Sequence, residues 1–307
     1  MDFFDLHCDT ALQLLESGQS LQTSTGHVSL EKAASLHRWG QVFALFIHDD
    51  KQGSAYSQYC LERDSFQRQL LACSEKIVQC RTAQDLKNAF AKNQYAAILS
   101  VENGSALEGR LDRLAEFAND GVKLLTLTWF GENELGYGSV EGGPLKPFGK
   151  QVITSLSQYG IVPDISHLSD EGASDVFTLY EGPVVASHSN ARKVTGHCRN
   201  LTDRQTREIV RRGGLIGLNL YVDFLCGKSE EESLDCVYRH MNHFLELGAC
   251  KVLSFGTDFD GSTPLKDVAD LSRIPALYNY LLQKGMNESL LQDVFFENAY
   301  QFWLRVL

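Results

Sequence analysis

The sequence lacks the features that mark several classes of protein. It has no run of basic residues and carries a formal net charge of −11. That charge argues against nucleic acid or an anionic membrane as a partner, because both need a cationic surface. No apolar run is long enough to span a bilayer. The eight cysteines are scattered and include no C-x-x-C pair, so we expect a cytoplasmic protein with reduced thiols.

Several motifs are also missing. There is no Gly-x-Ser-x-Gly sequence for a nucleophilic serine, and no phosphate-binding loop. Asp2 and Asp5 interrupt any signal-like apolar segment at the amino terminus. Carboxylates gathered around a site would instead attract divalent cations.

The apolar runs predict a chain in which strands alternate with helices. The length of 307 residues suits two small domains or one α/β barrel. Several strand-like runs are apolar throughout, which is typical of buried parallel strands. The predicted strands are 3–10, 41–47, 95–101, 122–128, 161–166, 183–187, 215–220 and 252–256. The segment 12–36 is amphipathic and broken by polar loop residues. The predicted helical segments are 56–80, 110–119, 150–159, 170–180, 202–212, 233–247 and 265–307.

Eight strands with helices between them predict an α/β fold of the (β/α)₈ (TIM) barrel type. A doubly wound open sheet is the alternative, but it would want the missing phosphate loop. No linker, repeat or low-complexity segment divides the chain. We therefore expect residues 1–307 to form a single barrel domain.

Polar side chains with metal-binding groups follow the apolar runs. Because the carboxyl ends of barrel strands converge on one mouth, side chains far apart in the chain should meet there. His7 and Asp9 are two residues apart, so on one strand they would point to the same side. The residues at these strand ends are His7, Asp9, Glu102, His167, His188 and Asp258.

Three histidines and two or three carboxylates suit zinc or a similar metal. The number of ligands exceeds the needs of one tetrahedral zinc with an open position. It fits two metals that share Glu102, because a carboxylate has two oxygens and an imidazole cannot span a pair. Two metals about 3.5–4 Å apart can hold a hydroxide between them and polarise a carbonyl.

Each of these residues also has a structural alternative. His7 could be a buried core histidine, with Asp9 as the N-cap of the next helix. His167 could belong to an N-cap region, and Asp258 could cap the segment after it. We expect the other histidines to be solvated or to support the ligands from behind: His27, His37, His48, His197, His240 and His243.

Five motifs carry a resemblance to a known family. They are Asp5-Leu6-His7-Cys8-Asp9-Thr10, Val101-Glu102-Asn103-Gly104, Asp164-Ile165-Ser166-His167, Ser187-His188-Ser189-Asn190-Ala191 and Gly256-Thr257-Asp258-Phe259-Asp260-Gly261. These motifs occur in the same order as in the renal (membrane) dipeptidase family of zinc peptidases, peptidase family M19, and span nearly the whole chain. The sequence therefore resembles this family. The sequence looks like a bacterial, cytosolic member without the signal and lipid anchor of the animal enzymes.

The resemblance implies two Zn²⁺ ions per chain. One zinc would be held by His7, Asp9 and Glu102, and the second by Glu102, His167 and His188. Asp258 would then shuttle a proton rather than act as a firm ligand.

The resemblance also implies residues that bind the substrate. Arg199 lies where the family places an arginine for the substrate's C-terminal carboxylate, a role that suits its planar fork. Without the resemblance, a surface salt bridge would be the preferred interpretation of Arg199. Tyr221 is a candidate for the pocket wall. The loop from Gly131 to Gly149, with Asn133, Glu134 and Tyr137, is expected to shape the pocket.

One position departs from the family. Animal members carry a histidine after the fourth strand that is thought to steady the tetrahedral intermediate, and the matching residue here is Trp129. An indole cannot act in the same way, although its N–H could donate a hydrogen bond. The departure bears on the choice of substrate more than on the metals.

The sequence therefore predicts a binuclear zinc dipeptidase in which a metal-bridging hydroxide attacks the peptide bond. The family accepts D-residues at the C-terminal side, so the same tolerance is expected here. Two alternatives stay open: a barrel amidohydrolase for N-acyl amino acids or lactones, and a peptide-binding paralogue without activity. Aromatic residues of the last helices could form core or a homodimer face, of which core is favoured: Tyr278, Tyr280, Phe295, Phe296, Phe302 and Trp303.

Overall fold

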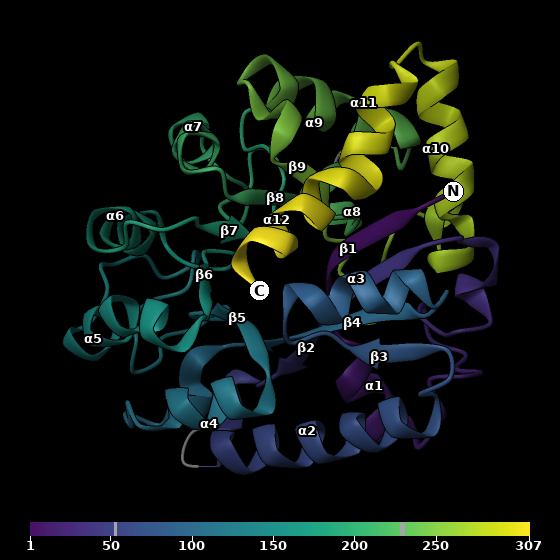
Figure 1. Ribbon diagram of the computed structural model, residues 1–307. Helices are drawn as coiled ribbons and strands as arrows, with labels where there is room; N and C mark the ends of the chain where they lie inside the picture. Colours follow the sequence, from purple (N-terminus) through teal and green to yellow (C-terminus); the bar gives the residue numbers. More distant parts are fainter. Residues whose placement is uncertain (52–53, 228–230) are drawn as a thin grey trace.

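The computed structural model describes residues 1–51, 54–227 and 231–307. Within these ranges, eight parallel strands close into a barrel, because β9 pairs with β1 and β2 pairs with β4 (Figure 1). The predicted (β/α)₈ barrel is confirmed. The barrel strands are β1 (Phe3–Cys8), β2 (Trp39–Phe46), β4 (Tyr95–Glu102), β5 (Val122–Thr126), β6 (Val162–Asp164), β7 (Val185–Ala186), β8 (Leu215–Leu218) and β9 (Leu253–Phe255).

Helices surround the barrel (Figure 1). Among the described helices, five begin at a residue whose side chain accepts a capping hydrogen bond. Some end at a glycine in the left-handed region, as α1 does at Gly18 with φ 66°. The helices are α1 (Thr10–Ser17), α2 (Ala55–Ala72), α3 (Ala83–Ala91), α4 (Arg113–Asp120), α5 (Pro147–Ser155), α6 (Asp170–Leu179), α7 (Asp203–Arg212), α8 (Val222–Leu225), α9 (Leu234–Glu246), α10 (Ile274–Gln283), α11 (Glu288–Gln292) and α12 (Asn298–Val306).

The helix predicted over 56–80 is wrong in its last part. α2 ends at Ala72, and a short strand, β3 (Ile77–Gln79), pairs with the first residues of β4. β3 therefore pairs with the first part of β4, and β5 pairs with the same edge of β4 only from Leu99 onward. The helix α3, which the sequence analysis did not predict, follows β3 and begins with a capping box between Thr82 and Asp85.

One end of the barrel is closed by helices. α12 and α3 lie across the amino-terminal ends of the strands (Figure 1). The aromatic residues predicted as core in 293–303 are buried, and Tyr278 and Tyr280 are partly buried. The apolar cluster at this end includes Phe4, Leu6, Val42, Leu86, Ile98, Leu124, Val162, Val185, Leu215, Phe302 and Trp303. With this end filled, the open mouth is at the carboxyl ends of the strands.

In the part of the chain that the structure describes, no helix is both long and apolar enough to cross a bilayer.

Candidate active site

The carboxyl ends of β1 and β4 bring an imidazole and two carboxylates together. His7 belongs to β1, Asp9 follows that strand by one residue, and Glu102 is the last residue of β4. His7 Nε2 lies 3.2 Å from Glu102 Oε2 and 3.4 Å from Asp9 Oδ2. All three side chains are almost completely buried. They form a compact group that could hold one metal ion.

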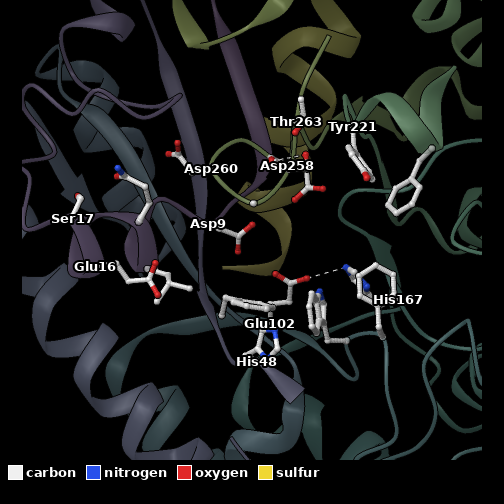
Figure 2. A pocket seen from close by; sticks show the side chains of 18 residues that line it. Asp9, Glu16, Ser17, His48, Glu102, His167, Tyr221, Asp258, Asp260 and Thr263 are labelled. Atoms are coloured by element: carbon white, nitrogen blue, oxygen red, sulfur yellow. Dashed lines mark hydrogen bonds and ion pairs between the residues drawn. The ribbon is translucent and has the colours of Figure 1, made fainter. Parts of the chain in front are cut away.

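The second oxygen of Glu102 faces two further histidines. His167 follows β6 and His188 follows β7, and their Nε2 atoms lie 3.0 and 3.6 Å from Glu102 Oε1. The two Nε2 atoms lie 2.9 Å apart. Figure 2 shows Asp9, Glu102, His167 and Asp258 pointing toward one another in the cavity. Glu102 thus lies between two groups of candidate ligands, one at each of its oxygens.

The structural alternative for Asp9 is not supported. Asp9 occupies the N-cap position of α1, but its side chain makes no capping hydrogen bond. Its φ and ψ of −100° and 23° also place it outside the strand. Asp9 therefore does not share a strand face with His7, as strand alternation predicted, although its carboxylate lies 3.4 Å from His7 Nε2.

The buried polar atoms of the site fit a bound cation. Buried polar atoms normally have hydrogen-bond partners, because leaving one unpaired is costly. Among the described residues, several atoms here have none: Nδ1 and Nε2 of His7, Oδ1 of Asp9 and Nδ1 of His167. Converging imidazole nitrogens and carboxylate oxygens are the donors that zinc takes.

Burial and neighbouring charges shift the pKa values of the candidate ligands. Burial raises the pKa of Glu102 to about 8, although the neighbouring His7 opposes the shift. Burial also lowers the pKa of His7, but the Glu102 and Asp9 carboxylates outweigh it and hold that pKa well above its usual value. Burial, reinforced by the positive charges of His7 and Arg199, keeps the pKa values of His167 and His188 well below normal. Neutral imidazole is the form that binds metals.

A hydrogen-bonded chain behind His188 orients its ring. Ser187 Oγ donates to Asp164 Oδ2 at 2.5 Å and lies 2.7 Å from His188 Nδ1. Since the hydroxyl proton goes to the carboxylate, Nδ1 of His188 donates to Ser187 Oγ. The backbone N–H groups of Ser166 and Ser187 donate to the other oxygen of Asp164. This support leaves the Nε2 lone pair of His188 facing Glu102.

Asp258 is held at the edge of the same group. Its Oδ1 lies 3.9 Å from His7 Nε2, and Asn219 Nδ2 donates to its Oδ2 at 3.0 Å. Asn219 is in turn fixed by a reciprocal pair of hydrogen bonds with Asn190. Asp258 has a φ of +63°, a left-handed conformation that aspartate adopts more readily than most residues. Burial raises the pKa of Asp258 to about 6.

Gly261 leaves the space that two of these carboxylates occupy. A Cβ there would lie 1.9 Å from Asp9 Oδ2 and 2.9 Å from Asp258 Oδ1. We expect Gly261→Ala to displace both carboxylates and to lower kcat/KM by about 10–100-fold, as removal of a residue that supports metal ligands does. The control is Gly196→Ala, because a Cβ at Gly196 meets nothing within 4 Å. Steady-state kinetics and metal analysis of the two variants test this expectation. Equal effects of the two substitutions would contradict the proposed role of Gly261.

Arg199 is buried rather than on the surface. Its side chain is 3% exposed, with Nη1 donating to Ser189 Oγ at 2.9 Å and Nη2 to the His188 carbonyl at 3.2 Å. The guanidinium lies 5.6 Å from the centre of the Phe224 ring, which lines the cavity. A surface salt bridge is therefore wrong as an interpretation. Arg199 lies behind the cavity wall, close to the ligand group, and burial lowers its pKa to about 10.

The site opens into a cavity of about 720 Å³. Trp129 and Tyr221 both line it, as the sequence analysis expected of Tyr221. Phe130, from the same segment as Trp129, lines it as well. The lining residues do not include Asn133, Glu134 or Tyr137. The 131–149 loop therefore supports the segments that line the cavity rather than lining it itself. Asn133, for example, donates from Nδ2 to Asn103 Oδ1 and to the Leu127 carbonyl.

Two residues at the site, His48 and Asn219, were not predicted as part of it from the sequence. His48, expected to be solvated or behind the ligands, is half exposed and lines the cavity. His240, in contrast, is fully buried and accepts a hydrogen bond from the backbone of Ala191. The role of Asn219 could not be predicted from the sequence, because Asn190 and Asp258, which it contacts, lie far from it in the chain.

A closed parallel barrel with histidines and carboxylates converging at its open mouth defines a metal-dependent hydrolase. Comparisons with known proteins refine this class. A model of the family described as membrane dipeptidase (peptidase family M19) matches residues 1–307. The chain belongs to this family and is an enzyme of the metallo-dipeptidase type, as its motifs predicted.

Individual relatives agree over most of the chain. A Klebsiella pneumoniae protein described as uncharacterized, from the pqqA 5' region, is 29% identical over 252 residues, covering 78% of this chain and 92% of that protein. An uncharacterized dipeptidase of Schizosaccharomyces pombe is 23% identical over 303 residues, covering 92% of this chain and 74% of its own.

Solved structures extend the likeness to the whole fold. A metallopeptidase from Rhodobacter sphaeroides, liganded with a phosphinate mimic of the dipeptide L-Ala-D-Ala, has a TM-score of 0.94 and 26% identity, covering 100% of this chain and 99% of that one. The family M19 metallopeptidase called dipeptidase AC has a TM-score of 0.92 and 28% identity, covering 99% of both chains.

Proposed function

We propose that this protein is a binuclear zinc dipeptidase. One zinc ion would bind His7, Asp9 and Glu102, and the other Glu102, His167 and His188. The observation that carries the proposal is the position of Glu102, whose Oε2 lies 3.2 Å from His7 Nε2 and whose Oε1 lies 3.0 Å from His167 Nε2. When bound, such a metal pair supplies Lewis acidity and makes water nucleophilic at neutral pH.

Asp258 is the residue suited to proton transfer. Its carboxylate lines the cavity beside the candidate ligands and is oriented by Asn219. In the proposed reaction it takes the proton of the attacking water and passes it to the leaving amine. Asn219 holds Oδ2, so Oδ1 is the oxygen directed toward His7 and the reacting group.

Arg199 supplies positive charge for the substrate's C-terminal carboxylate. Its position behind Phe224 and next to His188 puts that charge on the side of the cavity formed after β7 and β8. A fixed positive charge there favours dipeptides, because in longer chains the C-terminal carboxylate lies farther from the scissile bond. The relative liganded with a mimic of L-Ala-D-Ala supports a tolerance for D-residues at the C-terminal side.

Metal content tests the proposal directly. Gently purified protein should contain about two zinc equivalents per chain and hydrolyse L-Ala-D-Ala and L-Ala-L-Ala. Removal of the metal with a chelator should abolish activity, and added zinc should restore it. Fewer than about one equivalent, with chelator-resistant activity, would contradict the whole scheme. Faster hydrolysis of N-acyl amino acids or lactones than of any dipeptide would indicate an amidohydrolase instead. Absence of any hydrolysis would indicate a peptide-binding protein without activity.

A further inference from the structure

Four aromatic side chains form one continuous surface of the cavity: Phe46, His48, Trp129 and Phe130. We call this surface the aromatic wall. The Trp129 ring lies 5.0 Å from Phe46, 4.8 Å from His48 and 4.8 Å from Phe130, all centre to centre. The Phe46 and Phe130 rings meet Trp129 edge to face, an arrangement that aromatic rings favour.

The aromatic wall reaches the candidate metal ligands. The Phe130 ring lies 5.1 Å from the His167 ring at nearly a right angle, and the Trp129 ring lies 6.4 Å from it. A substrate carbonyl bound beside Glu102 and His167 would therefore place the adjoining side chain within reach of Trp129.

Partly buried hydrogen bonds hold the aromatic wall in place from behind. Glu62, which is fully buried, accepts a hydrogen bond from the backbone N–H of Phe46 at 2.9 Å. Asp49 accepts from Asn103 Nδ2 at 2.9 Å and from the Gly131 N–H at 2.8 Å, and so ties together the loops after β2, β4 and β5. A wall fixed in this way loses little freedom on binding, which favours affinity.

The position of the aromatic wall decides which residue of a dipeptide meets it. Phe46 ends β2 and His48 follows it, and β2 lies across the ring of strands from β7. Trp129 and Phe130 follow β5, which is two strands from β7. Arg199, Tyr221 and Phe224 follow β7 and β8. Figure 2 shows His48 and Tyr221 on opposite sides of Glu102. With the C-terminal carboxylate toward Arg199, the N-terminal residue lies toward the aromatic wall.

Apart from Leu12, the side chains on the rest of that side of the cavity are mostly polar. The lining residues from α1 include Gln13 and Glu16, and those after β9 include Asp260 and Ser262. An apolar side chain on the N-terminal residue would leave water most favourably against the aromatic wall.

We propose that the aromatic wall is the subsite for the N-terminal side chain and selects dipeptides that begin with a large apolar residue, aromatic residues above all. This inference rests on the proposed dipeptidase function and adds its substrate class. Trp129, which stands where animal members of the family have a histidine, is the main specificity-determining residue.

Kinetics with matched dipeptides test the subsite. The zinc-loaded wild type should hydrolyse L-Phe-L-Ala and L-Leu-L-Ala with a kcat/KM about tenfold or more above that for L-Ala-L-Ala. Trp129→Ala should remove most of this preference, because it should lower kcat/KM for L-Phe-L-Ala much more than for L-Ala-L-Ala. Trp129→Phe, which keeps an aromatic ring, should retain the preference. Leu12→Ala, which shortens an apolar side chain on the α1 side of the cavity, should leave the ratio unchanged.

Binding provides a readout that does not depend on turnover. Of the three tryptophans, Trp39 and Trp303 are fully buried, and Trp129 lines the cavity. In a zinc-loaded Asp258→Asn variant, L-Phe-L-Ala should change the indole fluorescence in a saturable way, at lower concentration than L-Ala-L-Ala. The additional Trp129→Phe exchange should remove the signal.

The outcomes separate this inference from the proposed function. If the wild type hydrolyses no dipeptide, the proposed function fails. If it hydrolyses dipeptides but L-Ala-L-Ala is as good a substrate as L-Phe-L-Ala, or L-Ala-L-Phe is preferred over L-Phe-L-Ala, only the assignment of the aromatic wall is overturned. Equal losses for all substrates in Trp129→Ala would likewise overturn it.

Discussion

Glu102→Gln is expected to lose both zinc ions and more than about 1,000-fold of kcat/KM, because it changes a ligand of both sites. Loss of one residue that merely supports a ligand already costs about 10–100-fold. The amide has the same shape, but its nitrogen cannot bind a cation. Zinc analysis of the purified variant and hydrolysis of L-Ala-L-Ala measure the two effects.

The fold itself should survive this exchange. Glu102 is 2% exposed, and replacing a buried carboxylate by a neutral group of the same size removes a desolvation penalty. The metal-free variant should therefore melt at or above the temperature of the metal-free wild type. Zinc should raise the Tm of the wild type but not of the variant, since a ligand stabilises only the state that binds it.

Glu62→Gln is the matched control for Glu102→Gln. Glu62 is also fully buried, and burial raises its pKa to about 8 as it does for Glu102. It accepts its hydrogen bonds from Gln58 and the Phe46 N–H rather than facing the candidate histidines. This variant should keep about two zinc equivalents, by the same ligand argument. If Glu102→Gln also kept two equivalents, Glu102 could not bridge the metals.

The fold could be predicted because each buried parallel strand is marked by its own apolar run. Ala96, Ile98 and Leu124, for example, are almost completely inaccessible and face other barrel residues. The strand β3 was missed because it has only three residues and adjoins a long amphipathic helix, where Ile77 continues the helical spacing. A run this short is decided by tertiary pairing with β4 rather than by local preference.

The candidate ligands could be predicted because each is a polar residue directly after an apolar run, which is visible in the sequence. The barrel fold then brings the ends of these strands together at one mouth. The groups that support them have no such signal. Ser187 has no distinguishing signal until the fold brings Asp164 next to it. His48 lines the cavity beside Trp129, a residue far from it in the chain. The polar contacts of Asn219 likewise connect three different loops.

Asp258→Asn should keep two zinc ions per chain and lose about 100- to 10,000-fold of kcat, the usual worth of a general acid–base group. Asparagine can accept the hydrogen bond that Asn219 Nδ2 now donates to Oδ2. It also tolerates the φ of +63° at this position. The variant should therefore differ in its ability to take up a proton and not in its placement, so KM should change little.

Asp260→Asn separates this effect from a general loss of carboxylate charge. Asp260 lines the same cavity with a φ of +66°, but its Oδ2 accepts a hydrogen bond from Thr10 Oγ1 at 2.6 Å. Among the residues that the structure describes, no candidate metal group includes Asp260. Its replacement should leave kcat within about tenfold of the wild type, because no proton of the reaction passes through it. Single-turnover measurements on both zinc-loaded variants make the comparison at the chemical step. A wild-type rate for Asp258→Asn, or equal losses in the two variants, would remove Asp258 from proton transfer.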